Sequence, residues 1–327
     1  MQLLIGLDDI TAAASRIGGH VLRTPTIQSP GLRSHLGVPV ELKLELLQYT
    51  GSFKPRGAFN KILGLSDQER SVGVVAVSGG NHGVAVAEVA GLLGITAVVV
   101  MPEYGPPAAI ARARVAGANV RLTPGMPEAF LLLDDLVAAG LTPVHPFDDP
   151  AVVAGQGTVG LEFVQDAPDL TDVLVSIGGG GLIAGVATAF RSLTPKVRIW
   201  GVETEGATAM SEALTAAQPV STAPTSIVTT LSAPHVSDLT LQHTVELVEE
   251  VIVVSDADAV RGSLMLAERA KVWAEPAAGC LIPVAQRVIR RVGPDVRLGL
   301  IVCGGNVTID AMNDWIARFG INSRVPP

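Results

Sequence analysis

The residue best suited to covalent chemistry is Lys54. It stands between Phe53 and Pro55, with Gly51 and Gly57 close by on either side. A lysine that bonds covalently to a carbonyl compound must be partly desolvated, because desolvation favours the neutral amine. The apolar neighbours provide such surroundings, and the glycines leave room for a bulky ligand. A solvated surface lysine is the alternative interpretation.

A run of four glycines, Gly178, Gly179, Gly180 and Gly181, is the second candidate. Each costs roughly 0.5–1 kcal/mol relative to alanine inside regular structure, so something must require their freedom. They follow an apolar run and precede a helical stretch, where several backbone N–H groups can turn toward one anion at a helix N-terminus. Phosphate is the obvious anion, and a tight turn without a ligand is the alternative.

The same glycines also fit a different function. Gly179, Gly181 and Ala184 satisfy the dinucleotide fingerprint G-x-G-x-x-A, and Glu203 ends the next apolar run about 20 residues later. This segment alone favours an NAD-dependent oxidoreductase. However, the fingerprint normally opens a nucleotide-binding domain, whereas here it lies past the middle of the chain.

Strands that alternate with helices must position these residues. Short runs rich in Val and Ile predict buried strands over 72–77, 95–101, 119–122, 173–177, 197–202, 250–254 and 298–302. Between them, helical composition covers 83–93, 107–116, 182–193, 256–271 and 278–291. This alternation predicts an α/β fold with mainly parallel sheets covered on both faces, and a ligand beyond the carboxyl ends of the strands. The proline-containing segment 142–157 predicts a crossover between two lobes.

Composition narrows the class of protein. The chain has 327 residues, of which 48% are hydrophobic and 17% charged, and its net charge is −8 without a basic stripe. Nucleic acid is therefore not an expected partner. No apolar run reaches the roughly 18 residues of a membrane span, and Asp8 and Asp9 argue against a signal peptide. We expect a cytoplasmic protein that uses part of its apolar surface in a homodimer.

The segment around Lys54 resembles the lysine motif S-F-K-x-R-G-A of fold-type II pyridoxal-phosphate (PLP) enzymes, the serine/threonine dehydratase or threonine ammonia-lyase family. Further motifs follow in the family's order and span almost the whole chain: Arg23-Thr24-Pro25, Ser78 to His82, the four glycines, Val202-Glu203-Thr204, Glu275-Pro276-Ala277, and Cys303-Gly304-Gly305-Asn306. Together these motifs are far more specific than any one alone.

The resemblance implies two open twisted sheets, mainly parallel and flanked by helices, as in the tryptophan-synthase-β-like fold. It implies a large PLP-binding domain of residues 1–66 and 150–327, and a small domain of residues 67–149 that closes over the substrate. The sequence stops soon after Cys303, so we expect no appended regulatory domain.

The resemblance also implies roles for the cofactor residues. Lys54 binds PLP covalently and then moves the Cα proton, while Phe53 lies against the pyridine ring. Asn81 bonds to the 3′-oxygen of the ring, and the glycines 178–181 hold the phosphate. Phe53 as plain core and Asn81 as a helix N-cap remain alternatives.

The substrate is implied to bind at Ser78, Gly79, Gly80, Asn81 and His82, whose backbone donors take its carboxylate. Racemases of the family carry a serine at the position of Gly79, which supplies a proton to the opposite face of the substrate. Glycine lacks that hydroxyl, so racemisation is not expected.

Cys303 matches the cysteine-bearing subgroup, in which a thiol faces the pyridine nitrogen. A thiol is a weak donor that leaves this nitrogen neutral, which favours prompt loss of the β-substituent. A small buried hydrophobe is the alternative role.

Glu203 and Ala207 match the family's cation site, but Ala209 replaces the aspartate of its divalent form. Potassium or no cation is therefore expected rather than Mg²⁺, and a local cap by Glu203 is the alternative.

These implications predict an ammonia-lyase that converts L-threonine or L-serine to a 2-oxo acid and ammonium. The alternatives are dehydration of hydroxyaspartate or a bulkier substrate, serine racemisation, β-replacement, an NAD-dependent oxidoreductase, and a cofactor-binding protein without activity. The sequence does not rank the possible β-hydroxy amino acids.

Overall fold

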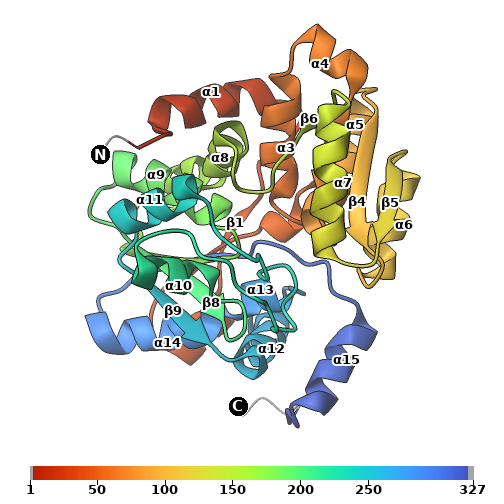
Figure 1. The fold of residues 1–327 in the computed structure, drawn as a ribbon. Coiled ribbons are helices and arrows are strands. Elements are labelled where there is room, and N and C mark those ends of the chain that lie inside the picture. The colour runs from red at the N-terminus through yellow and green to blue at the C-terminus, as the bar shows by residue number, and fades with distance from the viewer. Residues whose placement is uncertain (1–2, 323–327) are drawn as a thin grey trace.

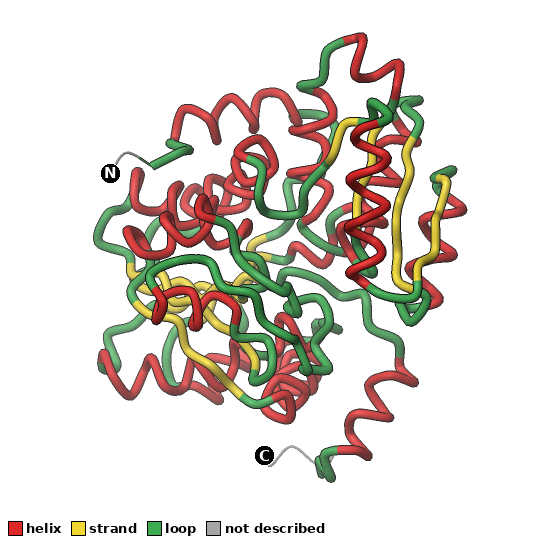
Figure 2. The backbone as a smooth tube through the Cα atoms, viewed as in Figure 1, coloured by secondary structure: helices red, strands yellow, loops and turns green. Residues whose placement is uncertain are grey.

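Two separate sheets form the framework of the computed structural model, which describes residues 3–322 (Figures 1 and 2). The larger sheet has the strand order β1-β2-β10-β7-β8-β9, and the smaller has the order β5-β4-β3-β6. Neighbouring strands are parallel except β1 and β2, which are antiparallel. The strands are β1 (Thr26–Gln28), β2 (Val40–Lys43), β3 (Val74–Val77), β4 (Ala97–Pro102), β5 (Asn119–Thr123), β6 (Thr142–Pro143), β7 (Asp172–Ser176), β8 (Arg198–Thr204), β9 (Glu250–Val254) and β10 (Leu298–Ile301).

Helices cover both sheets. They are α1 (Leu7–Ile17), α2 (Pro30–Leu36), α3 (Lys54–Leu63), α4 (Asp67–Val72), α5 (Asn81–Leu92), α6 (Pro107–Val115), α7 (Met126–Ala138), α8 (Pro150–Asp166), α9 (Gly181–Leu193), α10 (Ala209–Ala216), α11 (Asp238–Leu247), α12 (Asp256–Met265), α13 (Pro276–Gly279), α14 (Leu281–Val292) and α15 (Ile309–Arg318). Short 3₁₀ turns η1 (Glu45–Leu47) and η2 (Tyr49–Gly51) precede α3, and a π-helical turn, η3 (Leu266–Ala270), extends α12. No helix within residues 3–322 combines the length and the apolar character needed to cross a membrane.

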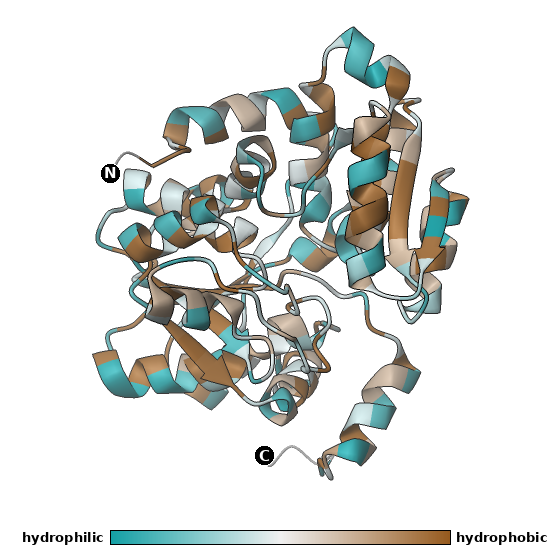
Figure 3. Cartoon of the chain, in the orientation of Figure 1, coloured by the Kyte–Doolittle hydropathy of each residue, from teal (hydrophilic) through white to brown (hydrophobic). Residues whose placement is uncertain are grey.

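The smaller sheet shows why its apolar runs become strands. Alternate side chains of a strand point to opposite faces. Val75 and Val77 pack with α7 on one face, whereas Val74 and Ala76 pack with α5 on the other. Every residue of β4 is buried, and Figure 3 shows this strand as almost uniformly hydrophobic. Continuous apolar runs are therefore required, because both faces are covered.

The predicted α/β class with mainly parallel, helix-flanked sheets is confirmed, and each predicted strand overlaps an observed one. The segment 142–157 does lead from the smaller sheet toward the larger one, and its second half is the start of α8, which begins at Pro150. Proline fits the first turn of a helix, and the Asp149 side chain accepts hydrogen bonds from the N–H groups of Ala151 and Val152. Only the short segment between β6 and α8 connects the two sheets at this point.

The division into a large domain (1–66 and 150–327) and a small closing domain (67–149) stays a prediction. The separate smaller sheet, formed by strands between Val74 and Pro143, supports it.

A buried ion cluster anchors α3, the helix that begins at Lys54. Arg56 is fully buried and forms two hydrogen bonds of 2.8 Å to Glu45, and its Nη1 lies 2.7 Å from Glu162 on α8. The ammonium of Lys43 on β2 lies 2.7 Å from the same Glu162. Charges of both signs are thus paired inside the protein, and they join β2, η1, α3 and α8.

We predict that Arg56→Leu lowers the free energy of unfolding by about 3–5 kcal/mol, because Glu45 would keep a buried charge without its partner. Urea unfolding measures this difference. Arg33→Leu is the matched control, since Arg33 is exposed, and it should unfold like the wild type. Equal stability of the two variants would contradict the anchoring role of the cluster.

Candidate active site

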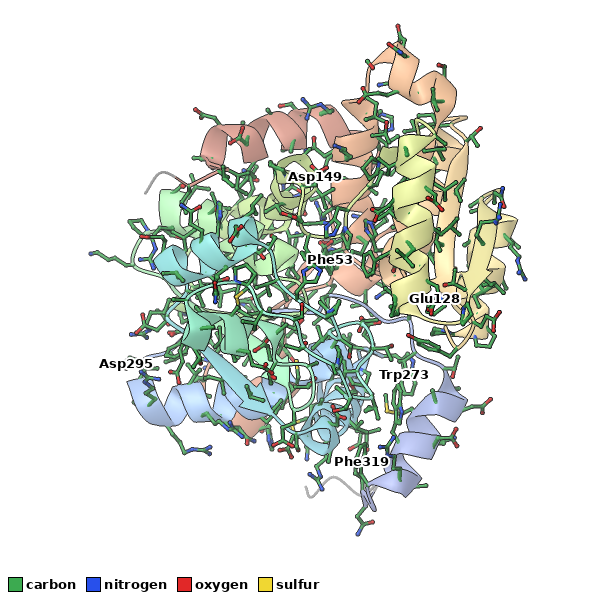
Figure 4. The ribbon with its side chains drawn as sticks, viewed as in Figure 1. Phe53, Glu128, Asp149, Trp273, Asp295 and Phe319 are labelled. Carbon is green, nitrogen blue, oxygen red and sulfur yellow. The ribbon has the colours of Figure 1, made fainter. Side chains whose placement is uncertain are left out.

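A cavity of about 770 Å³ lies between the two sheets. It brings together most of the residues that the sequence singled out, which come from segments far apart in the chain. Figure 4 shows one of them, Phe53, near the centre of the molecule. The predicted residues that line the cavity are Phe53, Lys54, Ser78, Gly79, Gly80, Asn81, His82, Gly178, Gly179, Gly180, Gly181 and Cys303. The predicted cation residues Glu203 and Ala207 are not in its lining.

Lys54 is the first residue of α3 and reaches the cavity rather than bulk solvent. Its Nζ lies 3.5 Å from the carbonyl oxygen of Pro146 and 4.9 Å from the centroid of the Phe53 ring. Burial lowers the pKa of Lys54 to about 8, although the nearby Cys303 and Glu275 oppose this shift. With this pKa the amine is half neutral near pH 8 and about a tenth neutral at pH 7, and the neutral form is the nucleophile.

The loop before Lys54 is tied to the end of β10. The N–H of Phe53 donates to the carbonyl oxygen of Cys303 at 3.1 Å, and Ser52 pairs with Gly304 in an isolated β-bridge. Gly51 has a φ of 75°, and a Cβ there would lie 2.6 Å from the amide oxygen of Asn306. Glycine is thus required at position 51 by both conformation and space.

The glycine loop joins β7 to α9 at the cavity. Gly180, the N-cap of α9, has a φ of 90° and provides no side-chain cap. A Cβ on Gly179 would overlap the ring of Phe147, and one on Gly181 would lie 3.1 Å from the Cα and Cβ atoms of Phe147. The N-terminus of α9 therefore meets the cavity with uncapped N–H groups inside a cradle that any side chain would fill. This arrangement suits a phosphate.

Cys303 follows β10 and is buried, with its Sγ 3.5 Å from the hydroxyl of Ser176. Burial raises the pKa of this thiol to about 12, so it is neutral. The cysteine can offer a weak hydrogen bond to a ligand but no charge.

Asn81 begins α5, and its N-cap is Gly80, so the alternative of Asn81 as the N-cap is wrong. Its amide nitrogen donates to both oxygens of Glu275, at 3.1 and 3.3 Å. Glu275 is a buried residue for which the sequence analysis gave no role, although its motif was part of the resemblance. Burial raises the pKa of Glu275 despite hydrogen bonds from Asn81, Asn306 and Thr230. Both oxygens of this carboxylate accept from the Asn81 amide nitrogen, which fixes the orientation of that amide.

Two histidines at the cavity are neutral and carry the same tautomer, with the proton on Nε2. The Nε2 of His82 lies 2.7 Å from the carbonyl oxygen of Val144, which only accepts, so the ring donates there. The Nδ1 of His145 accepts from the N–H of Asp148 at 2.7 Å, which leaves the proton on Nε2. Burial lowers the pKa of His82 to about 3 and that of His145 to about 4. The sequence analysis did not single out His145. The one signal for it was its position shortly after a strand, β6.

Glu203 stabilises α10 instead of facing the cavity. Its carboxylate accepts hydrogen bonds from the N–H of Met210 at 2.8 Å, the N–H of Ser211 at 3.0 Å and the Ser211 hydroxyl at 2.6 Å. These contacts match the local-cap alternative. Within the described part of the chain, no three His, Cys, Asp or Glu side chains gather as metal ligands would.

The donor set around the cavity fits PLP. A lysine with a lowered pKa suits the aldehyde, the uncapped helix N-terminus and its glycines suit the phosphate, and the neutral thiol suits a neutral ring nitrogen. A Cβ at Gly179 would occupy space beside Phe147 in the cradle that the phosphate needs, and one at Gly180 would collide with Met210 and Thr240 behind it.

Comparison with known proteins agrees with this chemistry. Residues 17–304 match the family model described as pyridoxal-phosphate dependent enzyme. The chain is 39% identical over 324 residues to an L-threonine ammonia-lyase of Thermotoga maritima, which covers 97% of this chain and 79% of the relative. It is 37% identical over 331 residues to a catabolic L-threonine dehydratase of Staphylococcus aureus, with coverage of 98% and 94%. The solved structure of maize serine racemase superposes with a TM-score of 0.89 at 32% identity, covering 96% of this chain and 97% of that one.

Proposed function

This chain belongs to the family of pyridoxal-phosphate dependent enzymes, and we propose that it is an ammonia-lyase that converts L-threonine or L-serine to a 2-oxo acid and ammonium. The observation that carries this proposal is the partly neutral amine of Lys54 at the cavity, beside an uncapped helix N-terminus. The threonine ammonia-lyase and threonine dehydratase relatives, similar over nearly the whole chain, support the substrate class.

Four groups of this chain would hold the cofactor. Lys54 would bind it covalently, and Gly178 to Gly181 would take its phosphate through backbone N–H groups. Phe53 would lie against the ring, and the Asn81 amide nitrogen, which donates to Glu275, would also reach the ring oxygen. Bound PLP supplies an electron-withdrawing ring that stabilises negative charge developing at the substrate Cα.

Proton transfer and elimination follow from the remaining side chains. As a free amine, Lys54 has a lowered pKa that suits removal of the Cα proton. The segment from Ser78 to His82 takes the substrate carboxylate. Cys303 is an uncharged thiol, so it would give the ring nitrogen no proton and a bound ring would be a weaker electron acceptor. This favours prompt loss of the β-hydroxyl: the Cα proton and the departing hydroxide together make one water, and hydrolysis of the enamine gives the oxo acid and ammonium.

The competing functions find less support. An NAD-dependent oxidoreductase would need the Glu203 carboxylate for a ribose, but both oxygens cap α10. Potassium binding at Glu203 and Ala207 stays a prediction, and the Glu203 oxygens that it would use accept hydrogen bonds from α10. The homodimer, the cytoplasmic location and the exact β-hydroxy amino acid also stay predictions.

Incubation of the purified enzyme with PLP and a panel of β-hydroxy amino acids tests the proposal. We expect 2-oxo acid from L-threonine or L-serine, and a loss of at least ~100-fold in Lys54→Ala because the base is gone. Lys196→Ala is the matched control, since Lys196 is exposed. Absence of 2-oxo acid from every substrate of the panel would refute the proposed function.

The reaction outcome depends on Gly79. A Cβ there would lie 3.2 Å from the Pro102 ring, so a small side chain fits after a slight shift. We predict that Gly79→Ser raises the ratio of racemisation to elimination, because its hydroxyl can supply a proton on the second face. Gly79→Ala adds the same Cβ without the hydroxyl and should leave this ratio unchanged.

Chiral analysis of the residual substrate, together with oxo-acid assays, measures the ratio. Wild-type enzyme that forms D-amino acid as fast as oxo acid would contradict the account of Gly79.

A further inference from the structure

A chain of hydrogen bonds runs from the surface of α6 to the buried carboxylate of Glu275. Nη1 of Arg112 donates to the amide oxygen of Asn306 at 2.9 Å. The amide nitrogen of Asn306 donates to the amide oxygen of Asn81 at 2.7 Å. The amide nitrogen of Asn81 then donates to Glu275 at 3.1 Å. Four side chains distant in sequence therefore form one continuous path.

The direction of this path is fixed by groups that can act in only one way. Arginine only donates, so it requires the oxygen of Asn306 on its side. The Asn306 nitrogen also donates to the carbonyl oxygen of Thr50 at 2.8 Å, and a carbonyl only accepts. An ionised Glu275 likewise only accepts. Neither amide can rotate by 180° without losing bonds at both ends, so the chain specifies one arrangement.

The path joins the elements of the two sheets across the cavity. Arg112 on α6 and Asn81 on α5 belong with the smaller sheet, while Asn306 follows β10 of the larger one. Figure 1 shows this segment, in blue, running below the smaller sheet toward α15. The missing Cβ of Gly51 leaves the space that the Asn306 side chain fills. Asn306 is thus fitted between the lysine loop and the smaller sheet.

We propose that Arg112 is a positioning residue that acts through Asn306 to hold the segment from Ser78 to His82 at the cavity. Without the guanidinium, the Asn306 oxygen would bond to water and its side chain could leave Asn81. Asn81 would then keep only its contact with Glu275, and the start of α5 would open more often. This inference rests on the proposed function, because that segment is the one proposed to bind the substrate carboxylate.

Hydrogen–deuterium exchange of the PLP-loaded enzyme tests the positioning role directly. In Arg112→Ala, peptides covering residues 78–92 should exchange about fivefold faster, the factor that corresponds to one typical hydrogen bond. The KM for L-threonine should rise by a similar factor while kcat changes less. Arg112→Lys should restore slow exchange in part, because its ammonium can donate to the same oxygen.

Two further variants keep the test decisive. Arg114→Ala removes an exposed arginine from the same helix and should exchange like the wild type. Asn306→Asp keeps the shape but replaces the donating nitrogen with an acceptor, so it should match or exceed Arg112→Ala. Unchanged exchange at 78–92 in Arg112→Ala, or an equal increase in Arg114→Ala, would overturn the inference. A wild type without lyase activity would instead refute the proposed function, and the exchange result would stand on its own.

Discussion

A lysine amine with a lowered pKa must be kept away from bulk water, so the backbone that carries it has to be held in place, and the Arg56 cluster meets this constraint. Arg56 lies two residues beyond Lys54 in the first turn of α3, where Glu45 and Glu162 clamp its guanidinium. A buried ion pair adds little net stability, but breaking it is costly because a charge is left without a partner. The cluster therefore fixes the start of α3 in one position. Together with the bonds of Phe53 and Ser52 to the end of β10, it holds Lys54 at the cavity.

Most of the titratable groups that line the cavity are neutral or only partly charged. Lys54 titrates near pH 8, the Cys303 thiol is neutral, and His82 and His145 are neutral with their protons on defined nitrogens. The cavity therefore holds few negative charges that would repel the anionic groups of a cofactor and an amino acid. Glu275 is the exception, and its carboxylate is engaged in orienting Asn81. Backbone N–H groups are the donors available to the phosphate. Ligand recognition at such a site depends on which neutral group donates or accepts a hydrogen bond at each ligand atom. The direction of the hydrogen bonds therefore matters more than the net charge.

The strands and the position of the cavity could be predicted from the sequence, because they depend on residues that are close together in the chain. The runs around Val75 and Val99 predicted buried strands, and the unusual residues after strand ends predicted the position of the cavity. Helix α8 was not predicted, because Pro150 and several glycines weaken the helical pattern and the Asp149 cap is visible only in the structure. The partners Glu275 and Asn306 were missed as functional groups for another reason: each acts through a residue about 200 positions away. No spacing rule in a single sequence reveals such contacts.

The central claim is that the anchored, desolvated Lys54 is the residue that binds the cofactor. Borohydride reduction of the PLP-loaded enzyme converts a lysine–cofactor bond into a stable secondary amine, and peptide mass mapping then locates it. We predict one modification, on the peptide that contains Lys54, and none on Lys43 or Lys61. A modification on another lysine, or a loaded protein without any modified lysine, would contradict the account.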